Sequence, residues 1–422
     1  MKKLAVIFFT TRYKKGGDKF KVVAETISRE KEIEGFETIC QAIDSKQELI
    51  DLFSQIHSSK SVINELHFVG HSGMYGPMFG SKSYPQQFSP YELRRLNIPF
   101  SEEAIAKFHA CRSSRWFAPY FSKVQNVRTY GYHWYTSFSK NKNRFKFSFF
   151  SKDRPDLYLI GCPGMKSHGI LASAKKYLGI MKAEEWKEFI PTDEPVDRSY
   201  DEVANLYSIV FDDIKVRQDE YKWIMEHLPN TNNVSVLDIG CGNGALLKEL
   251  NSRIHKGVGV DVSKNLIENA QNKHVMFSNL SFVKIDGPSL PFEDNSFDVV
   301  ISLLSFRYLD WDPIIEEIQR VLGKQGKLII IDMVTAPIKL WEVPQFIHNK
   351  VRLYLGRIKN PLFHKNLKKL VAHKDWQRML NYNPIRSKHE MVWFLKSRFP
   401  NSTMRTINIG LHSRVIAFEA TI

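Results

Sequence analysis

The sequence predicts an α/β protein of two domains. A chain of 422 residues is longer than one hydrophobic core normally serves. Short apolar runs alternate with segments of helical periodicity in both halves, which is the pattern of parallel sheets covered by helices. With 43% hydrophobic and 25% charged residues, the composition is that of a folded protein and excludes a collagen-like, coiled-coil or largely disordered chain.

The net charge of +15 is unevenly distributed along the chain. Residues 1–190 hold 30 basic and 18 acidic side chains, residues 191–335 hold 14 and 23, and residues 336–422 hold 16 and 4. Blocks of +12, −9 and +12 therefore follow one another. Because basic surfaces attract anions, this pattern favours an anionic small molecule, nucleic acid or an anionic membrane surface as a partner.

The cysteines and the apolar runs indicate a cytoplasmic protein. Cys40, Cys111, Cys162 and Cys241 form neither a Cys-x-x-Cys pair nor a dense disulfide framework. The apolar run at residues 4–10 has no small-residue cleavage site after it, so we interpret it as a first strand. No run approaches the roughly 20 apolar residues of a membrane-spanning helix, which leaves only peripheral membrane contact open. The sequence carries no signal for a particular oligomeric state.

The first domain is assigned to residues 1–160. Its expected elements are a strand at 4–10, helices at 18–31 and 47–56, a strand at 66–69 and a helix at 100–106. Two apolar runs end in reactive side chains, since His71 follows ELHFVG and Cys111 follows AIAKFHA. The carboxyl ends of parallel strands share one edge of a sheet, so these two side chains can meet there.

This arrangement resembles the caspase-like fold, an α/β sandwich, and especially its bacterial CHAT-type branch, in which one strand ends in His-x-Gly and a later one in Ala-Cys or Ser-Cys. The resemblance covers about residues 1–150, including VRTYGYHWYTSFS. It implies that His71 is a general base and Cys111 a nucleophile, with an oxyanion hole at the N–H groups of Gly73 and Cys111. Because Arg112-Ser113-Ser114 follows Cys111 without a glycine, we favour a binding or regulatory module over an active cysteine peptidase.

Two other features of this region receive simpler interpretations. A zinc cluster of His67, His71, His109 and Cys111 is the least favoured reading, because His67 and His71 share a face only in a regular strand, and we expect no metal. The basic segment 14–17 lacks the Gly-Lys-Ser/Thr ending of a phosphate-binding loop, so we expect a turn.

Residues 161–199 are expected to form a linker and a connecting helix. The periodicity loosens from residue 141 to 195, where a basic aromatic run at 143–150, a Gly-Cys-Pro-Gly turn at 161–164, a helix at 173–189 and a proline-flanked break at 191–195 follow one another. Residues 199–230 then predict one or two amphipathic helices, with Val203, Leu206, Tyr207 and Val210 on one face.

The segment VSVLDIGCGNGALLKEL at residues 234–250 carries the most informative motif. An apolar strand at 234–239 leads into a glycine turn and a helix that begins near Ala245. The glycines allow a sharp turn close to a ligand, and Asp238 at the strand end favours a cationic or hydroxyl-bearing partner. A second strand ends at Asp261, 23 positions further on, where a carboxylate can accept hydrogen bonds from ribose hydroxyls. A third strand ends near Asp286 and a fourth covers 297–302.

Together these motifs resemble a class I S-adenosylmethionine-dependent methyltransferase, which implies a Rossmann-like domain over residues 200–422 and S-adenosylmethionine as cofactor. The motifs themselves span about residues 200–335. The resemblance places the methionine part of the cofactor on Asp238, Gly240, Cys241, Gly242 and Gly244, the ribose on Asp261 beside Val262, the adenine amino group on Asp286 beside Gly287, and the sulfonium near Ser302 and Leu303. Tyr200 and Tyr207 match positions that cover the cofactor, although helical spacing fits core packing equally well. Gln325-Gly326 stands where the family has Gly-Gly.

Acceptor specificity is expected in residues 336–398, a helical lid insertion ahead of two closing strands at 404–409 and 413–421. One helical face carries apolar side chains, namely Ile347, Val351, Tyr354, Leu355 and Ile358, and the polar side carries Lys350, Arg352, Arg357, Lys365, Lys368 and Lys369. Three interpretations remain open. The insertion is a lid with a solvated basic face, an anion-binding lid over the acceptor, or a basic amphipathic surface that rests on anionic lipid.

The predicted function is methylation of a small, anionic metabolite. Transfer from a sulfonium is an in-line displacement on an activated carbon, so alignment at about 3 Å supplies much of the acceleration. A general base is needed only if the acceptor must lose a proton, and the candidates are His348, His364, His373 and Tyr308, for which we favour surface or packing roles.

Two alternative functions stay open beside this one. The first is methylation of RNA or protein, but SLLSFRYLD at 302–310 lacks the Asn/Asp-Pro-Pro-Tyr/Phe segment typical of base methylation, so nucleic acid is not favoured. The second is a bifunctional protein in which His71 and Cys111 form an active peptidase dyad.

Overall fold

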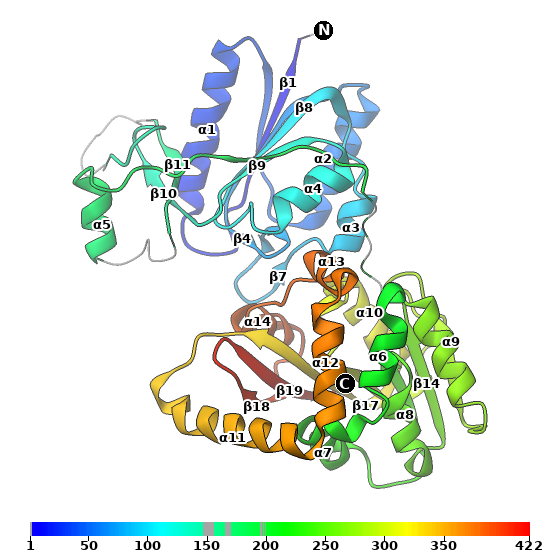
Figure 1. Ribbon diagram of the computed structural model, residues 1–422. Coiled ribbons are helices and arrows are strands. Elements are labelled where there is room, and N and C mark those ends of the chain that lie inside the picture. The colour runs from blue at the N-terminus through cyan, green and yellow to red at the C-terminus, as the bar shows by residue number, and fades with distance from the viewer. Residues whose placement is uncertain (1, 147–155, 165–169, 195, 197, 199) are drawn as a thin grey trace. The chain divides into compact units, whose positions relative to one another are not determined.

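The computed structural model describes residues 2–146, 156–164, 170–194, 196, 198 and 200–422. The chain divides into two compact units, Met1–Pro195 and Val196–Ile422 (Figure 1). We refer to them as the N-terminal and C-terminal units. Each contains an α/β sheet of its own, so the α/β class predicted from the sequence is confirmed.

The N-terminal unit is built on a six-stranded sheet. In spatial order its strands are β12 (Lys187–Phe189), β9 (Arg128–Gly131), β8 (Phe100–His109), β3 (Ile63–Val69), β1 (Leu4–Phe9) and β2 (Glu37–Ala42). Neighbouring strands are parallel except β12, which runs antiparallel to β9. Every residue of β1 is buried, as expected for a strand covered on both faces.

The remaining elements of this unit are helices and short strands. The helices are α1 (Gly17–Ile33), α2 (Lys46–Ser58), α3 (Pro90–Arg95), α4 (Phe117–Gln125) and α5 (Ile170–Tyr177). Three antiparallel pairs are formed by β4 (Ser72–Gly73) with β5 (Gly76–Pro77), β6 (Phe79–Gly80) with β7 (Pro85–Gln86), and β10 (Tyr135–Ser139) with β11 (Tyr158–Cys162). The predicted basic aromatic run at 143–150 lies outside the described residues from position 147 onward.

Two predictions for this unit are wrong. The helix expected at 100–106 is part of strand β8, in which Ala104, Ala106 and Phe108 alternate as buried residues between β3 and β9. Good helix formers such as Glu102 and Glu103 suggested a helix, but tertiary pairing overrides such propensities. The helix expected at 173–189 ends at Tyr177, and residues 187–189 form strand β12 instead.

The C-terminal unit contains a seven-stranded sheet. In spatial order its strands are β15 (Leu280–Lys284), β14 (Lys256–Asp261), β13 (Ser235–Ile239), β16 (Phe297–Leu303), β17 (Leu322–Thr335), β19 (Ser413–Thr421) and β18 (Thr403–Ile409). The first five are parallel, and β19 is antiparallel to both of its neighbours. The strands expected at 234–239, 297–302, 404–409 and 413–421 are thereby confirmed.

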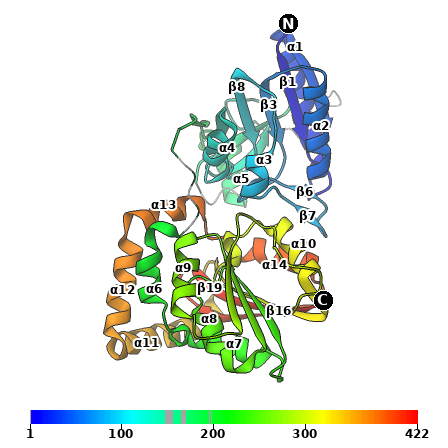
Figure 2. The same ribbon diagram turned by 90° about the vertical axis from the view of Figure 1, so that its right-hand side faces the viewer.

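Helices flank this sheet, and further helices form an insertion between β17 and β18. The flanking helices are α6 (Ala204–Val210), α7 (Gln218–His227), α8 (Ala245–Leu250), α9 (Lys264–Lys273) and α10 (Trp311–Val321). The insertion after β17 forms α11 (Val343–Lys359), α12 (Pro361–Ala372), α13 (Lys374–Tyr382) and α14 (Lys388–Arg398). Helix α12 runs beside α6 in both views (Figures 1 and 2). The insertion therefore lies next to α6, the helix that contains Tyr207.

The insertion helices differ in how they pack. Helix α14 begins with a capping box of Ser387 and Glu390 and buries Met391 and Leu395. By contrast, no residue of α11 is buried. Within the described residues, no helix is long and apolar enough to cross a membrane.

Candidate cofactor site

The glycine turn after β13 is fixed by close packing. Gly240, Gly242 and Gly244 have φ angles of 75°, 55° and 77°, in the left-handed region that favours glycine. A Cβ at Gly240 would lie 2.3 Å from Cβ of Ser305, and one at Gly242 would lie 3.1 Å from the ring of Tyr207. The turn therefore requires glycine at these positions, as the sequence motif predicts.

Two acidic side chains lie at the ends of adjacent strands. Asp238 and Asp261 come from β13 and β14, which pair in parallel, and their exposed fractions are 2% and 9%. Asp261 accepts hydrogen bonds from the backbone N–H of Gly242 to Oδ2 at 3.0 Å and from that of Ser263 to Oδ1 at 2.9 Å. The carboxylate is thus held in one orientation beside the glycine turn.

Asp238 has no such partner at one oxygen. Its Oδ1 is buried and makes no hydrogen bond to the described residues. Burial, together with the charge of Asp261, raises the pKa of Asp238 to about 8. A buried acceptor without a donor is costly, which is the condition expected where a ligand supplies the missing donor.

Aromatic side chains cover the turn. The ring of Tyr207 in α6 lies 5.4 Å from that of Tyr200, which in turn lies 6.0 Å from Tyr308 and 5.6 Å from Trp376 in α13. Burial raises the pKa of Tyr200 and Tyr207 above the usual range of a phenol. Both phenols are therefore neutral near physiological pH, and these rings form a largely apolar cover assembled from three segments.

The segment that carries these tyrosines is tied to the cofactor-side loops. Oδ1 of Asp201 accepts hydrogen bonds from Ser263 Oγ at 2.6 Å and from the N–H of Asn265 at 3.0 Å. Nδ2 of Asn243, inside the glycine turn, donates to the carbonyl oxygens of Ser208 and Phe211. The sequence did not predict these contacts of Asp201 and Asn243. The position of Asp201 directly after Tyr200, which was predicted to cover the cofactor, was a usable signal.

Other residues predicted for the cofactor are placed differently. The side chain of Asp286, two residues beyond β15, is 90% exposed and forms an ion pair with Lys284. Gly287 follows it, and Val262, directly after β14, is 41% exposed. Asp286 and Val262 are therefore exposed and Gly287 is partly exposed, whereas the carboxylates of Asp238 and Asp261 are buried.

The end of β16 supports the glycine turn. Ser302 is fully buried, and its Oγ lies 2.7 Å from Oγ of Ser305, which donates to the carbonyl oxygen of Ile239. Leu303 is the last residue of the strand and is partly exposed. Ser302 thus acts through Ser305 on the end of β13, a contact that no sequence motif predicted.

A buried ion pair joins the segment after β16 to β17. Arg307, after β16, pairs with Asp332 of β17, and Arg307 Nη2 donates to the hydroxyl of Tyr308 at 2.8 Å. Burial opposes the charge of Arg307, but Asp332 raises its pKa above the usual range. The Nε atom of Arg307 is buried and makes no hydrogen bond to the described residues. Because no motif links positions 307 and 332, the sequence did not reveal this pair.

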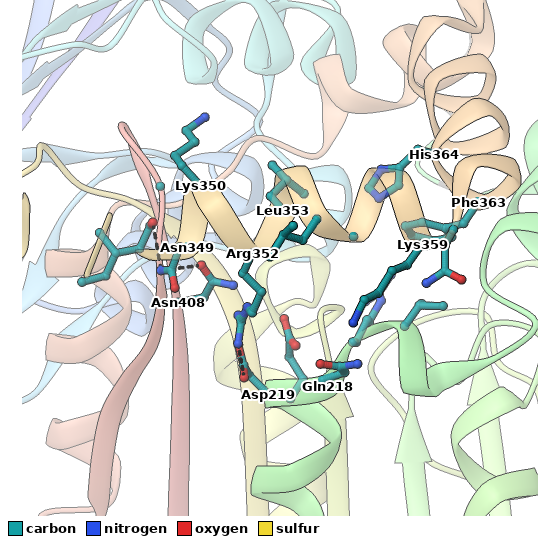
Figure 3. A pocket seen from close by; sticks show the side chains of 18 of the residues that line it. Gln218, Asp219, Asn349, Lys350, Arg352, Leu353, Lys359, Phe363, His364 and Asn408 are labelled. Atoms are coloured by element: carbon teal, nitrogen blue, oxygen red, sulfur yellow. Dashed lines mark hydrogen bonds and ion pairs between the residues drawn. The ribbon is translucent and has the colours of Figure 1, made fainter. Parts of the chain in front are cut away.

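A cavity of about 920 Å³ lies between α11, the start of α7 and the turn after β18 (Figure 3). Arg352 points from α11 toward Asp219, with which it forms an ion pair. Lys350 and Lys359 also line the cavity, and neither forms an ion pair within the described part of the chain. Phe363 lines it as well and packs on Phe211, whose ring lies 4.8 Å from Tyr207. Two aromatic rings therefore link this cavity to the cover of the glycine turn.

The four candidate general bases occupy different environments. His364 lines the cavity and His348 is exposed on α11. His373 accepts a hydrogen bond from the N–H of Asp375 at the start of α13. The hydroxyl of Tyr308 accepts its hydrogen bond from Arg307.

His71 and Cys111 follow the neighbouring parallel strands β3 and β8 but have separate partners. His71 Nε2 lies 3.1 Å from the carbonyl oxygen of Lys15, and its ring packs against Tyr13 and Phe20. The Sγ of Cys111 accepts from the N–H of Thr136 at 3.3 Å. Among the described residues no hydrogen bond joins His71 to Cys111. Burial lowers the pKa of His71, so the imidazole is neutral near pH 7.

Of the residues considered for zinc, His67 and His109 contact each other, whereas His71 and Cys111 have other partners. His67 Nδ1 lies 3.2 Å from Nε2 of His109, and His67 Nε2 lies 3.0 Å from Glu65. The described part of the chain contains no group of three or more His, Cys, Asp or Glu side chains suited to a metal ion.

Comparison with known proteins identifies the kind of site. Residues 237–330 match a family model described as a methyltransferase domain. A sterol 4-C-methyltransferase of Caenorhabditis elegans is 36% identical over 118 residues, covering 26% of this chain and 34% of the relative. A demethylmenaquinone methyltransferase of Staphylococcus aureus is 24% identical over 229 residues, covering 53% of this chain and 90% of the relative. The chain thus spans about a third of the sterol relative's length.

Solved structures include a SAM-dependent methyltransferase from Aquifex aeolicus, with a TM-score of 0.34 and 16% identity over 51% of this chain and 97% of that one. The matched residues 237–330 begin in β13 and end in β17, so they enclose the glycine turn, Asp238, Asp261 and Arg307. Residues 237–330 therefore resemble a methyltransferase domain, and the cofactor that this match indicates is S-adenosylmethionine.

Proposed function

We propose that the protein transfers a methyl group from S-adenosylmethionine to a small-molecule acceptor and that Asp238 and Asp261 hold the cofactor. The observation that carries this proposal is the buried Oδ1 of Asp238, which has no hydrogen-bond donor beside a turn that only glycine permits. The cofactor brings an ammonium group and ribose hydroxyls, which are the donors that these two carboxylates need. The site therefore fits the cofactor in charge and in hydrogen bonding.

The residues of the chain contribute mainly by positioning. Bound S-adenosylmethionine supplies an activated methyl group on a sulfonium. Asp261, fixed by Gly242 and Ser263, orients the ribose hydroxyls, while Tyr200 and Tyr207 cover the turn and exclude water. Alignment of the acceptor in a dry site accounts for much of the acceleration in such displacements.

We infer that the acceptor combines an apolar ring system with an anionic group. The named relatives act on a sterol and on demethylmenaquinone, which are apolar ring compounds. The aromatic cover suits a ring, and the cavity beside it presents Lys359, a cation without a carboxylate partner among the described residues. This interpretation retains the anionic acceptor predicted from the charge pattern. Asp286, Gly287, Val262, Ser302 and Leu303 stay proposed as outer cofactor positions.

A transfer assay separates this function from its alternatives. The full chain is incubated with methyl-labelled S-adenosylmethionine and a cell extract, and the label is then counted in organic, aqueous small-molecule, RNA and protein fractions. We expect label in a small-molecule fraction and none with Asp261→Ala. Label in RNA or protein would overturn the proposed acceptor class, and label that does not depend on Asp261 would overturn the proposed site.

We further propose that the N-terminal unit is a caspase-like module with a binding or regulatory role. The strands that precede His71 and Cys111 are parallel neighbours, which supports the resemblance. The separate hydrogen bonds of the two side chains support an inactive module over a peptidase, because a general base must reach the thiol whose proton it takes. Incubation of the full chain with a peptide library tests this proposal, since cleavage that is lost in Cys111→Ala would contradict it.

A further inference from the structure

Helix α11 presents its apolar side to solvent and its polar side to the protein. The side chains of the apolar side are between 49% and 64% exposed, and we call this set the α11 stripe: Ile347, Val351, Tyr354, Leu355 and Ile358. A surface helix of a folded protein normally buries such a stripe. Large exposed apolar patches commonly mark a binding surface.

The opposite side of α11 is held by polar contacts. Asn349 Nδ2 donates to Oδ1 of Asn408 at 3.1 Å and to the carbonyl oxygen of Ile409 at 3.2 Å, both at the end of β18. Arg352 Nη1 donates to Oδ1 of Asp219 in α7 at 2.8 Å (Figure 3). These bonds fix the rotation of the helix about its axis, so the outward direction of the α11 stripe follows from specific contacts.

The charge around the stripe favours an anionic partner. Helices α11 and α12 together carry seven Lys and Arg residues and no Asp or Glu. On the helical wheel Lys350 and Arg357 flank the stripe on one side. Figure 3 shows Lys350 pointing away from Asp219 and Gln218, whereas Lys359 points toward Gln218. Contact with a second copy through this face would bring Lys350 and Arg357 of both copies together, which like-charge repulsion disfavours.

We propose that the α11 stripe docks the protein on an anionic membrane surface, with the apolar side chains in the interface and the flanking cations against lipid phosphates. Amphipathic helices that bind in this way have an apolar face bordered by Lys and Arg, and their affinity depends on anionic lipid. The proposal concerns the outer side of α11, so it does not depend on the identity of the methyl acceptor.

Vesicle co-sedimentation of the full chain tests the proposal. We expect binding to mixed phosphatidylcholine–phosphatidylglycerol vesicles, weaker binding to phosphatidylcholine alone, and a decrease with added salt. The variant Val351→Asp/Ile358→Asp should weaken the partition coefficient at least about tenfold, because two buried side chains are lost from the interface. The control Val275→Asp/Met276→Asp places the same charges on residues that are 83% and 78% exposed between α9 and β15, and it should bind as the wild type does.

A second variant keeps the test decisive if the first does not fold. Lys350→Gln/Arg357→Gln alters exposed cations only, and it should reduce both the affinity for phosphatidylglycerol vesicles and its salt dependence. Calorimetric titration with S-adenosylmethionine should give wild-type affinity in every variant, which separates docking from cofactor binding. The proposal is overturned by no sedimentation of the wild type, by equal sedimentation of all variants, or by self-association that the α11 variants abolish.

Discussion

The backbone N–H of Gly242 donates a hydrogen bond of 3.0 Å to Oδ2 of Asp261. This bond ties the glycine turn after β13 to the end of β14, and the N–H of Ser263 holds the other carboxylate oxygen. Each oxygen retains a second lone pair for a ligand. The carboxylate is therefore oriented before any cofactor binds, which lowers the entropic cost of binding.

Replacing a glycine of the turn by alanine should weaken cofactor binding more than the same change at Gly35, where the added Cβ meets open space. Gly240→Ala would place Cβ 2.3 Å from Ser305, whereas Gly35, with a φ of 89°, has no atom within 4 Å of the added carbon. Both changes carry the cost of a left-handed alanine, about 1–2 kcal/mol, and only Gly240→Ala adds a collision. Calorimetric titration with S-adenosylmethionine should show weaker binding for Gly240→Ala and wild-type binding for Gly35→Ala. Equal affinities in the two variants would contradict the close packing described here.

Asp238 should make the stability of the cofactor-free protein depend on pH. Its folded-state pKa of about 8 lies above the value of about 3.9 in an unfolded chain. As pH rises between these values, the unfolded chain releases this proton and the folded chain keeps it, so stability is lost up to about pH 8. Thermal unfolding followed by circular dichroism should show a smaller loss between pH 5 and 8 for Asp238→Asn. Identical pH profiles for wild type and variant would count against a neutral, buried Asp238.

Breaking the buried Arg307–Asp332 pair should destabilise the C-terminal unit. Asp332 is fully buried in β17, and its removal leaves the guanidinium of Arg307 without its counter-charge. Asp332→Ala should lower the free energy of unfolding by about 3–5 kcal/mol, measured by urea denaturation. The double variant Arg307→Met/Asp332→Leu should recover part of this loss, since it removes both charges. A double variant that loses the sum of the two single changes would show that the residues do not interact.

Cys111 should react independently of His71. No hydrogen bond joins the two side chains in the described structure, and the thiol sulfur accepts from Thr136. The rate of alkylation of Cys111 by iodoacetamide, followed by mass spectrometry, should therefore be the same in wild type and His71→Ala. A large decrease in the variant would instead indicate an activated dyad and favour the peptidase alternative.

The sequence predicted the cofactor turn well and the packing around it poorly. Strand β13, the three glycines and Asp261 could be predicted, because a buried strand and a sharp turn leave a local pattern of apolar and glycine residues in the sequence. The Arg307–Asp332 pair left no such pattern, because the two residues are 25 positions apart and meet only through the pairing of β16 with β17.

Helical periodicity also has a limit that α11 illustrates. The spacing of Ile347, Val351 and Tyr354 predicted an apolar face, but periodicity does not state whether a face is directed to the core or to solvent. The polar contacts of Asn349 and Arg352 decide this direction, and their partners lie 59 and 133 positions away in the chain. Strand β8 shows the same limit. Its residues locally favour a helix, but pairing with β3 and β9 makes them a strand.

Calorimetric titration of the purified full chain with S-adenosylmethionine tests the central claim most directly. We predict saturable binding at one site per chain and a loss of affinity of at least about tenfold in Asp261→Ala, because hydrogen bonds to a charged group contribute about 1.5–3 kcal/mol each. Circular dichroism of the variant controls for folding. An absence of saturable binding in the wild type, or undiminished affinity in a folded Asp261→Ala variant, would contradict the account.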